Sequence, residues 1–351
     1  MSTNLYNVQL EDIFVHRVGN RNKGEDIFIS ELPVPLNDER HSLLKEYYLK
    51  PFRDKEADFY CFSDDEDLDY NVVYGACAEV FADPDTLMEN SQTIARHLYQ
   101  QSDHPHIRSG EVQVVFMKDA IVGNEKCNAI GIFKSEIKKE FVNFKEDNHN
   151  RLEMELQQGI DLSKLDKGCI VFDLESDKGY KVLSVDSNKY DAKYWVENFL
   201  DLDVFEDENF LTKKYLKFTQ DFAKDVVGPA AGKLDEIKFA KDAAKHFASN
   251  EDFNESVFLN EVLIDPTMIA EYKNYKVDQG AKHSIEDTQM FNIANPAVQV
   301  ASKKLKTKIV VDTGAVIDLK KMQNVNEYVE RGFDEERGMY YYLIYHNTEE
   351  K

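Results

Sequence analysis

The chain has 351 residues, 42% hydrophobic and 12% aromatic, and its 66 Asp and Glu outnumber 43 Lys and Arg, for a formal net charge of −23. This apolar and aromatic content excludes an intrinsically disordered chain, and the length favours two or more subdomains. The acidic excess repels DNA phosphates and anionic lipid, but salt screens charges beyond about 8 Å, so any polyanion must bind at a local basic area.

The first hundred residues predict strands followed by helices. Two strands are expected over 8–18 and 25–34, joined by the polar turn GNRNKGE. Asn37 and Asp83 stand where helix N-caps are expected. The predicted helices cover 36–49, 71–82 and 83–101.

The sequence pattern changes over residues 111–186, where short segments of alternating apolar and polar residues are separated by polar turns. This pattern is typical of an antiparallel sheet. The predicted strands are EVQVVFMKDAIV, NAIGIFKSE, EFVNFKED, RLEMELQQGI, GCIVFDLE and YKVLSVD.

Residues 191–300 have helical spacing. The candidate helix 209–227 places Leu211, Tyr215, Phe218 and Phe222 at i, i+4, i+7 and i+11, which predicts one buried apolar stripe. Further helices are predicted over 233–248, 254–264 and 266–277.

The C-terminal part, 303–346, returns to strands. KLKTKIVVD and AVIDLK are expected to pair across DTG, a short helix covers 324–331, and GMYYYLIYH forms the last strand. The predicted fold class is α+β. The predicted domains are an α+β sheet domain over 1–190, a helical region over 191–300 and a C-terminal ββαβ unit over 301–351.

Cysteine spacing and the start of the chain bear on the cellular compartment. Cys61, Cys77, Cys127 and Cys169 stand singly, without C-x-x-C spacing, which predicts reduced thiols in a cytoplasmic protein. The first twenty residues lack the apolar run of a signal peptide, and no segment approaches ~18 apolar residues. We therefore expect no membrane association and no cofactor.

One short stretch stands out against the acidic background. ASKKLKTKIV holds Lys303, Lys304, Lys306 and Lys308 without an acid, whereas residues 1–150 sum to −12 and residues 151–300 to −11. In a strand, the lysines at 304, 306 and 308 would share one face. That face is either the solvated, aggregation-resistant side of an edge strand or a surface that contacts phosphates.

Two predicted helices carry further lysines at helical spacing. Each set is the solvated side of an amphipathic helix in the ordinary interpretation. Convergence of these sets with ASKKLKTKIV would neutralise about four phosphates and give a log–log salt slope near −3.6. The helix lysines are Lys213, Lys217, Lys224, Lys238, Lys241 and Lys245.

The strand MYYYLIYH alternates aromatic side chains between its faces. Exposed aromatics of this kind can stack on unpaired bases, whereas a strand buried on one side, with its Tyr hydroxyls in water, is commoner. We favour the second interpretation for Tyr340 and Tyr342, which share one face.

Other chemistry is poorly supported. SDDEDLDY lacks the Gly of an EF-hand loop, and GPAAGKL is one residue too short between its glycines for a phosphate-binding P-loop. The histidines at 97, 104 and 106 have no clear fourth metal ligand. Asp85, Glu136 and Lys138 could serve a metal-dependent nuclease, but such residues are too abundant here to be diagnostic. We predict neither a metal site nor catalytic residues.

Three segments carry a resemblance to a known family. They are LEDIFVHRVGN near the start, residues 169–222 beginning CIVFDLESDKGYKVLSVD, and ERGFDEERGMYYYLIYH at 330–346. In these the chain resembles the bacterial nucleoid-associated protein family, in its Bacteroidetes-type branch, along nearly its whole length. The resemblance implies a cytoplasmic protein on the nucleoid that binds DNA, without established catalytic residues.

The sequence thus predicts a non-enzymatic nucleoid-associated protein that contacts DNA through its lysines, with a homodimer possible. The alternative is an acidic adaptor that docks on basic chromosomal proteins without touching DNA. A metal-dependent nuclease is the third hypothesis and the least favoured.

Overall fold

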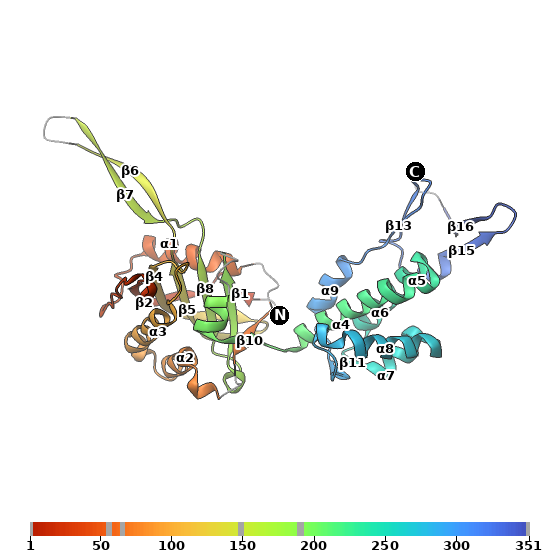
Figure 1. Ribbon diagram of the computed structural model, residues 1–351, viewed down its shortest axis with the longest axis horizontal. Helices are drawn as coiled ribbons and strands as arrows, with labels where there is room; N and C mark the ends of the chain where they lie inside the picture. Colours follow the sequence, from red (N-terminus) through yellow and green to blue (C-terminus); the bar gives the residue numbers. More distant parts are fainter. Residues whose placement is uncertain (1–2, 54–57, 64–66, 147–150, 188–192, 349–351) are drawn as a thin grey trace. The chain divides into compact units, whose positions relative to one another are not determined.

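The computed structural model describes residues 3–53, 58–63, 67–146, 151–187 and 193–348. The chain forms two compact units, Met1–Phe205 (unit 1) and Glu206–Lys351 (unit 2) (Figure 1). The α+β class is confirmed, since a large antiparallel sheet comes first, helices follow, and small β-hairpins end the chain. The division into three domains stays a prediction.

Unit 1 is built on one eight-stranded antiparallel sheet. Its order is β1-β4-β5-β8-β9-β3-β10, and β2 also pairs with β4. The strands are β1 (Thr3–Asn4), β2 (Gln9–Val18), β3 (Tyr60–Phe62), β4 (Gly110–Val122), β5 (Glu125–Ser135), β8 (Lys167–Phe172), β9 (Lys181–Asp186) and β10 (Leu202–Val204).

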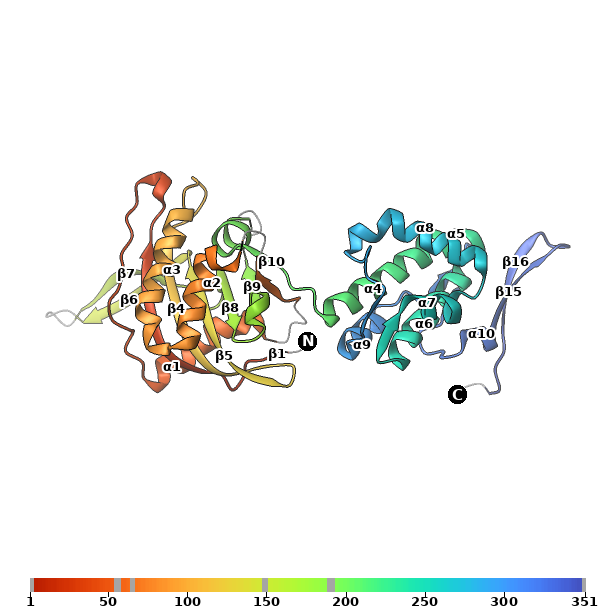
Figure 2. The same ribbon diagram turned by 90° about the horizontal axis from the view of Figure 1, so that it is seen from below.

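The central strands of this sheet are buried on both faces because helices cover each side. Helices α2 (Val72–Ala82) and α3 (Leu87–Gln101) lie across one face (Figure 2), where Ile130 and Ile132 of β5 join the core. Helix α1 (Asp38–Leu49) covers the other face, where the Tyr48 ring stacks on Phe133 with centroids 4.3 Å apart. Alternating apolar side chains therefore enter two separate cores.

The predicted strand over 25–34 is wrong. That segment forms a single β-bridge with β2, at Arg17–Phe28, and one further backbone hydrogen bond, from the Val34 N–H to the Ile13 carbonyl at 2.8 Å. The backbone N–H of Ser30 donates to the His16 ring, 3.1 Å from Nδ1, instead of to a β2 carbonyl. Pro33 then lacks an N–H, so the ladder cannot continue.

Two strands of the predicted sheet leave it and form a separate hairpin. Strands β6 (Lys138–Glu146) and β7 (Leu152–Ile160) pair only with each other. Figure 1 shows this hairpin projecting from the body of unit 1. We call it the arm.

Unit 2 is mainly helical. Its elements are α4 (Glu208–Phe222), a π-helical continuation (Ala223–Val227), α5 (Gly228–Ala231), α6 (Lys233–Ser249), β11 (Asp252–Asn254), α7 (Glu255–Phe258), a π-helical turn (Leu259–Leu263), α8 (Pro266–His283), β12 (Met290–Asn292) and α9 (Asn295–Lys303). The predicted stripe of α4 is confirmed for Tyr215, Phe218 and Phe222, which are buried in a core rich in aromatic rings, whereas Leu211 is only half-buried. Helix α9 was not predicted.

The C-terminal segment packs its hairpins beside α6. The strands are β13 (Lys308–Val310), β14 (Val316–Asp318), β15 (Val329–Asp334) and β16 (Met339–Ile344), and α10 (Val325–Tyr328) lies between the two pairs. Leu234 and Ile237 of α6 share a small core with Ile309 and Leu319. The predicted helix over 324–331 ends at Tyr328, because the chain continues as β15.

Candidate nucleic-acid interface

Unit 2 has a cleft of about 190 Å³ that is lined by several of the predicted lysines. It lies where α4, α6 and the end of α9 pack together (Figure 1). Its lining residues are Lys217, Gln220, Asp221, Ala223, Lys224, Glu236, Ala240, Lys304, Leu305 and Lys306. Four lysines from two segments far apart in sequence thus face one space, which we call the lysine cleft.

The α4 segment presents its lysines opposite its apolar stripe. Because Tyr215, Phe218 and Phe222 are held in the core, Lys217 and Lys224 point outward with side chains 59% and 69% exposed. Lys217 Nζ lies 2.5 Å from Asp221 Oδ1, and Lys224 Nζ lies 3.5 Å from a carboxylate oxygen of its neighbour Asp225. Asp221 therefore offsets one of the two charges within the cleft.

The second pair of lysines follows the end of α9. The prediction that a strand presents Lys304, Lys306 and Lys308 on one face is wrong, because residues 304–307 are irregular and β13 begins at Lys308. The alternation nevertheless persists, since Thr307 and Ile309 are buried and the intervening lysines are exposed. Lys304 and Lys306 are therefore free to line the cleft.

Lys308 differs from these lysines because it forms an ion pair. Lys308 Nζ lies 3.6 Å from Asp318 Oδ2, whose pKa is lowered first by the Lys320 backbone N–H and less by the Lys308 charge. In the part of the chain that the structure describes, no carboxylate lies within 4.0 Å of the ammonium groups of Lys303, Lys304 and Lys306. These three charges are available to an external anion.

The α6 lysines do not join the cleft. Lys241 is engaged internally, since its Nζ donates to Leu319 O at 2.7 Å and to Met322 O, and burial lowers its pKa. At about 100° per residue, Lys238 and Lys245 lie roughly opposite the cleft-lining Glu236 and Ala240. Two of the three predicted lysine groups therefore meet. Lys213 lies one turn before Lys217 on α4 and does not line the cleft.

Two features of this region were not predicted from the sequence. Gln220 and Glu236 line the cleft, but nothing in their local pattern marks them. Lys320 and Lys321 are exposed on the turn that Lys241 holds against α6, and the run DLKK was the available signal.

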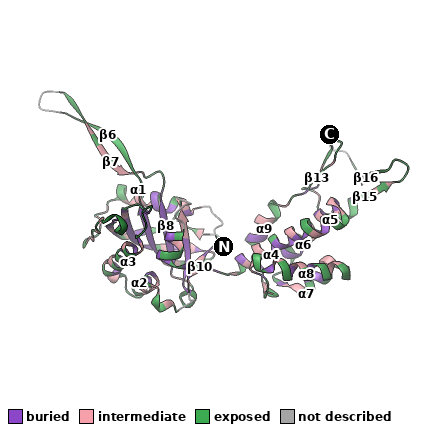
Figure 3. Ribbon diagram, viewed as in Figure 1, coloured by how far each residue is buried: buried purple, intermediate pink, exposed green. Residues whose placement is uncertain are grey.

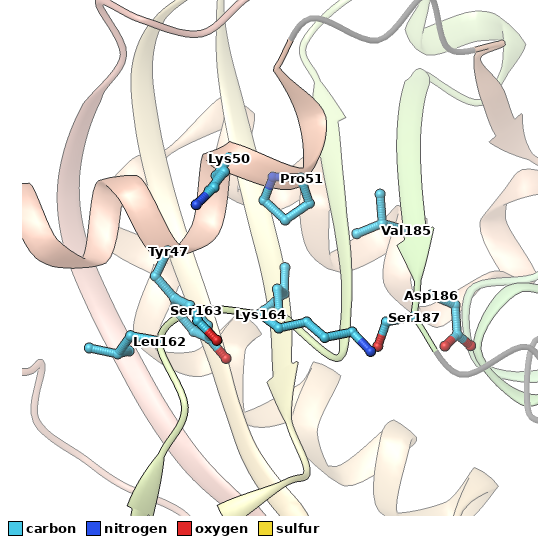
Figure 4. A pocket seen from close by; sticks show the side chains of 10 residues that line it. Tyr47, Lys50, Pro51, Leu162, Ser163, Lys164, Val185, Asp186 and Ser187 are labelled. Atoms are coloured by element: carbon cyan, nitrogen blue, oxygen red, sulfur yellow. The ribbon is translucent and has the colours of Figure 1, made fainter.

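A second pocket, of about 300 Å³, lies in unit 1 (Figure 4). Figure 4 shows the Lys164 side chain extended toward Ser187, with Leu162 at the opposite end of the pocket near Ser163. Burial raises the pKa of Tyr47 to about 12, and Asp186 accepts a hydrogen bond from the buried Lys167 at 2.8 Å. These groups are held in structural roles, so the pocket offers no evident acid–base pair.

The nuclease candidates are not brought together as a site. Glu136 pairs with the buried Lys134 and Lys138 pairs with Glu111, each at 2.8 Å, while Asp85 lies in the turn before α3. Among the described residues, no three His, Cys, Asp or Glu side chains gather as metal ligands. Within SDDEDLDY, residues 64–66 lie outside the described residues.

The remaining candidates have structural explanations. His97 Nε2 bonds the Phe199 carbonyl oxygen at 3.1 Å, and the His104 and His106 rings lie 5.2 Å apart without a third ligand type nearby in the described residues. GPAAGKL forms the junction of α5 and α6, where Gly232 has a φ of +101°. Of the two tyrosines expected to share a buried face, Tyr342 is half-buried against the small core beside α6, whereas Tyr340 is exposed, with the Arg331 guanidinium 4.1 Å from its ring centroid.

Comparison with known proteins gives one result. The sequence model of the family described as nucleoid-associated protein YejK matches residues 14–336, which is most of the chain. No curated protein sequence matches it. No helix among the described residues is both long and apolar enough to span a membrane.

Proposed function

The chain belongs to the nucleoid-associated protein family, and on this basis we propose that it contacts DNA phosphates through the lysine cleft. The observation that carries the proposal is the meeting of Lys217 and Lys224 with Lys304 and Lys306 in one space. Lys217 is paired with Asp221 and Lys224 lies 3.5 Å from Asp225, whereas no carboxylate of the described residues lies within 4.0 Å of the Lys304 and Lys306 ammonium groups, so the cleft keeps a local positive charge on a chain of charge −23.

The chemistry favours backbone contact over base reading. Ammonium groups pair with phosphate oxygens as point charges and carry no bidentate pattern for a base edge. A space of about 190 Å³ admits a phosphate group, while the duplex would lie across the exposed ends of the lysines. The proposed binding is therefore independent of DNA sequence, and we propose a non-enzymatic role on the bacterial nucleoid, in the cytoplasm.

The test is a titration of labelled duplex DNA at several salt concentrations, read by fluorescence anisotropy. If Lys304 and Lys306 each neutralise one phosphate, the log–log salt slope is about −1.8. The double change Lys304→Glu and Lys306→Glu should remove both contacts and flatten the slope to near zero. The matched control is Lys238→Glu with Lys245→Glu, which adds the same charge on the opposite side of α6.

Two results would overturn the proposal. One is an unchanged slope in the Lys304/Lys306 variant. The other is an equal loss in the α6 control, which would make net charge, and not the cleft, the determinant. Circular dichroism spectra of both variants should match the parent protein, because all four side chains are solvent-facing or partly exposed.

The acidic composition supports a second candidate, an adaptor that binds basic chromosomal proteins. The chain has 66 Asp and Glu against 43 Lys and Arg, an excess of carboxylates that a basic polypeptide would bind. If the chain is such an adaptor, it should bind a Lys-rich polypeptide at low salt and should not bind duplex DNA. Binding of DNA with a steep salt dependence would exclude it as the sole function.

A further inference from the structure

The arm of unit 1 has no role in the proposed function and presents an unusual surface. Strands β6 and β7 pair over nine residues each, from Lys138–Ile160 at the base to Glu146–Leu152 near the tip. At about 3.4 Å per residue the arm extends roughly 30 Å. Figure 3 shows it coloured as exposed along most of its length.

The two faces of the arm differ in chemistry. Direct cross-strand pairing places Val142 beside Leu156 and Phe144 beside Met154, with Leu152 next along the same face. These five side chains belong to residues that are 47–68% exposed. We call this surface the apolar arm face.

The opposite face is mainly polar, with its charged side chains paired and one large apolar residue, Phe141, 49% exposed. Lys145 Nζ lies 2.8 Å from Glu155 Oε2, and Arg151 lies 2.9 Å from Glu153. The Phe141 ring on this face lies over Gly159, where a Cβ would come within 2.9 Å of it. One side of the arm is therefore suited to water, and the apolar arm face is not.

The physics of a hairpin requires something to cover the apolar arm face. An isolated two-stranded hairpin is marginally stable in water, and independent stability needs packing on a hydrophobic face. Five large apolar side chains gathered on one ribbon also form the kind of contiguous patch that marks an interaction site.

The charges of the arm narrow the choice of partner. Its base cations are also paired, Lys138 with Glu111 at 2.8 Å and Lys139 with Asp161 at 2.6 Å. With these, Lys145 and Arg151 all paired with carboxylates, the described residues of the arm offer little to phosphate or acidic lipid. The fitting partner presents an apolar surface of matching size.

The area fits a second copy of the same surface. Five half-exposed side chains offer on the order of 100 Å² each, so two facing arms would bury about 1,000 Å² in total. That reaches the lower limit for a specific protein–protein interface. Two-fold symmetry lets one patch serve as its own partner, with two ribbons packed about 10 Å apart. We propose that the arm is a self-association element and that two copies of the chain pair through their apolar arm faces.

The experiment is sedimentation velocity of the full chain over roughly a hundredfold range of concentration. The parent protein should sediment as a dimer. The variant Phe144→Glu with Met154→Glu should sediment as a monomer, because four uncompensated carboxylates in the pair would weaken association at least ~100-fold. The control variant Asn143→Glu with Gln157→Glu adds the same charge to the polar face and should remain dimeric.

Three outcomes would overturn the proposal. They are a parent protein that stays monomeric at the highest concentration, a Phe144/Met154 variant that stays dimeric, and a control that dissociates as fully as that variant. Phe144, Met154 and Asn143 are exposed, Gln157 is half-buried, and none of the four belongs to either core of unit 1, so an unchanged circular dichroism spectrum should confirm that folding is intact.

Discussion

The buried pair of Lys134 and Glu136 provides the sharpest test of how unit 1 is stabilised. The two side chains are 0% and 3% exposed, and Lys134 Nζ lies 2.8 Å from Glu136 Oε1. The same ammonium group donates to the Arg108 carbonyl at 2.7 Å and lies 5.3 Å from the Tyr194 ring centroid. Changing Glu136→Gln removes the negative charge and leaves the shape almost unaltered.

The expected loss is large because the lysine stays buried after its partner has gone. Breaking a buried ion pair from one side costs about 3–5 kcal/mol, whereas replacing both members by apolar residues of similar volume is often nearly neutral. The double variant Lys134→Met with Glu136→Leu should therefore be more stable than Glu136→Gln alone. The difference in unfolding free energy between these two variants shows how much of the loss in Glu136→Gln comes from leaving the Lys134 charge unpaired.

The assay is urea unfolding followed by tryptophan fluorescence. Trp195 is the single tryptophan, is fully buried in unit 1 and follows Tyr194 directly, so its signal reports this unit. With a urea m-value of about 2–3 kcal/mol per molar, Glu136→Gln should lower the midpoint by roughly 1–2 M. The control Glu11→Gln breaks the exposed pair with Lys118, and its midpoint should be nearly unchanged.

The reasoning would be refuted by a Glu136→Gln midpoint that matches the control. A double variant that loses as much stability as the two single changes added together would also refute it, because the residues would then act independently.

Three further predictions concern single positions. Burial lowers the pKa of His16 to about 4, and its neutral ring is satisfied by Ser91 Oγ and the Ser30 N–H. Because the unfolded chain binds the proton more tightly, unit 1 should lose on the order of 2–3 kcal/mol as pH falls from 6.5 toward 4, and urea midpoints of His16→Gln should lack that dependence. Gly179→Ala should cost more than about 1 kcal/mol by the same assay, because φ is +83° and a Cβ would lie 2.3 Å from the Phe62 carbonyl oxygen. Lys241→Met should free two carbonyls of the turn after β14, and limited proteolysis there should become faster while the Trp195 signal is unchanged.

The sequence was a good guide to elements with strong periodicity. The alternation over 111–186 predicted six strands that all exist, and the stripe of Tyr215, Phe218 and Phe222 predicted the buried face of α4. It could not show that β6 and β7 leave the sheet. Strand pairing depends on which edges are free in the folded unit, and local pattern carries no such information.

The sequence identified several of the lysines in the candidate site but not how they are arranged in space. The lysines at 303–308 were identified by their contrast with the acidic background. A strand was predicted for them, however, so the end of α9 at Lys303 was not recognised. The signal for that helix was Pro296 near its start with Ala297, Val298 and Ala301 at helical spacing. Packing of α9 on α4 and α6 is tertiary, and it alone determines that Lys304 faces the cleft.

Availability of each lysine, not the number of lysines, decides what the acidic chain can bind. Of the ten predicted contacts, Lys241 is committed to carbonyls and Lys308 to Asp318, whereas Lys304 and Lys306 lie beyond reach of any carboxylate in the described residues. The same accounting explains the arm, where each Lys and Arg that the structure describes is paired with an acid and the uncommitted surface is apolar. A polyanion should therefore select the cleft and an apolar partner the arm, although the net charge of the chain would predict neither.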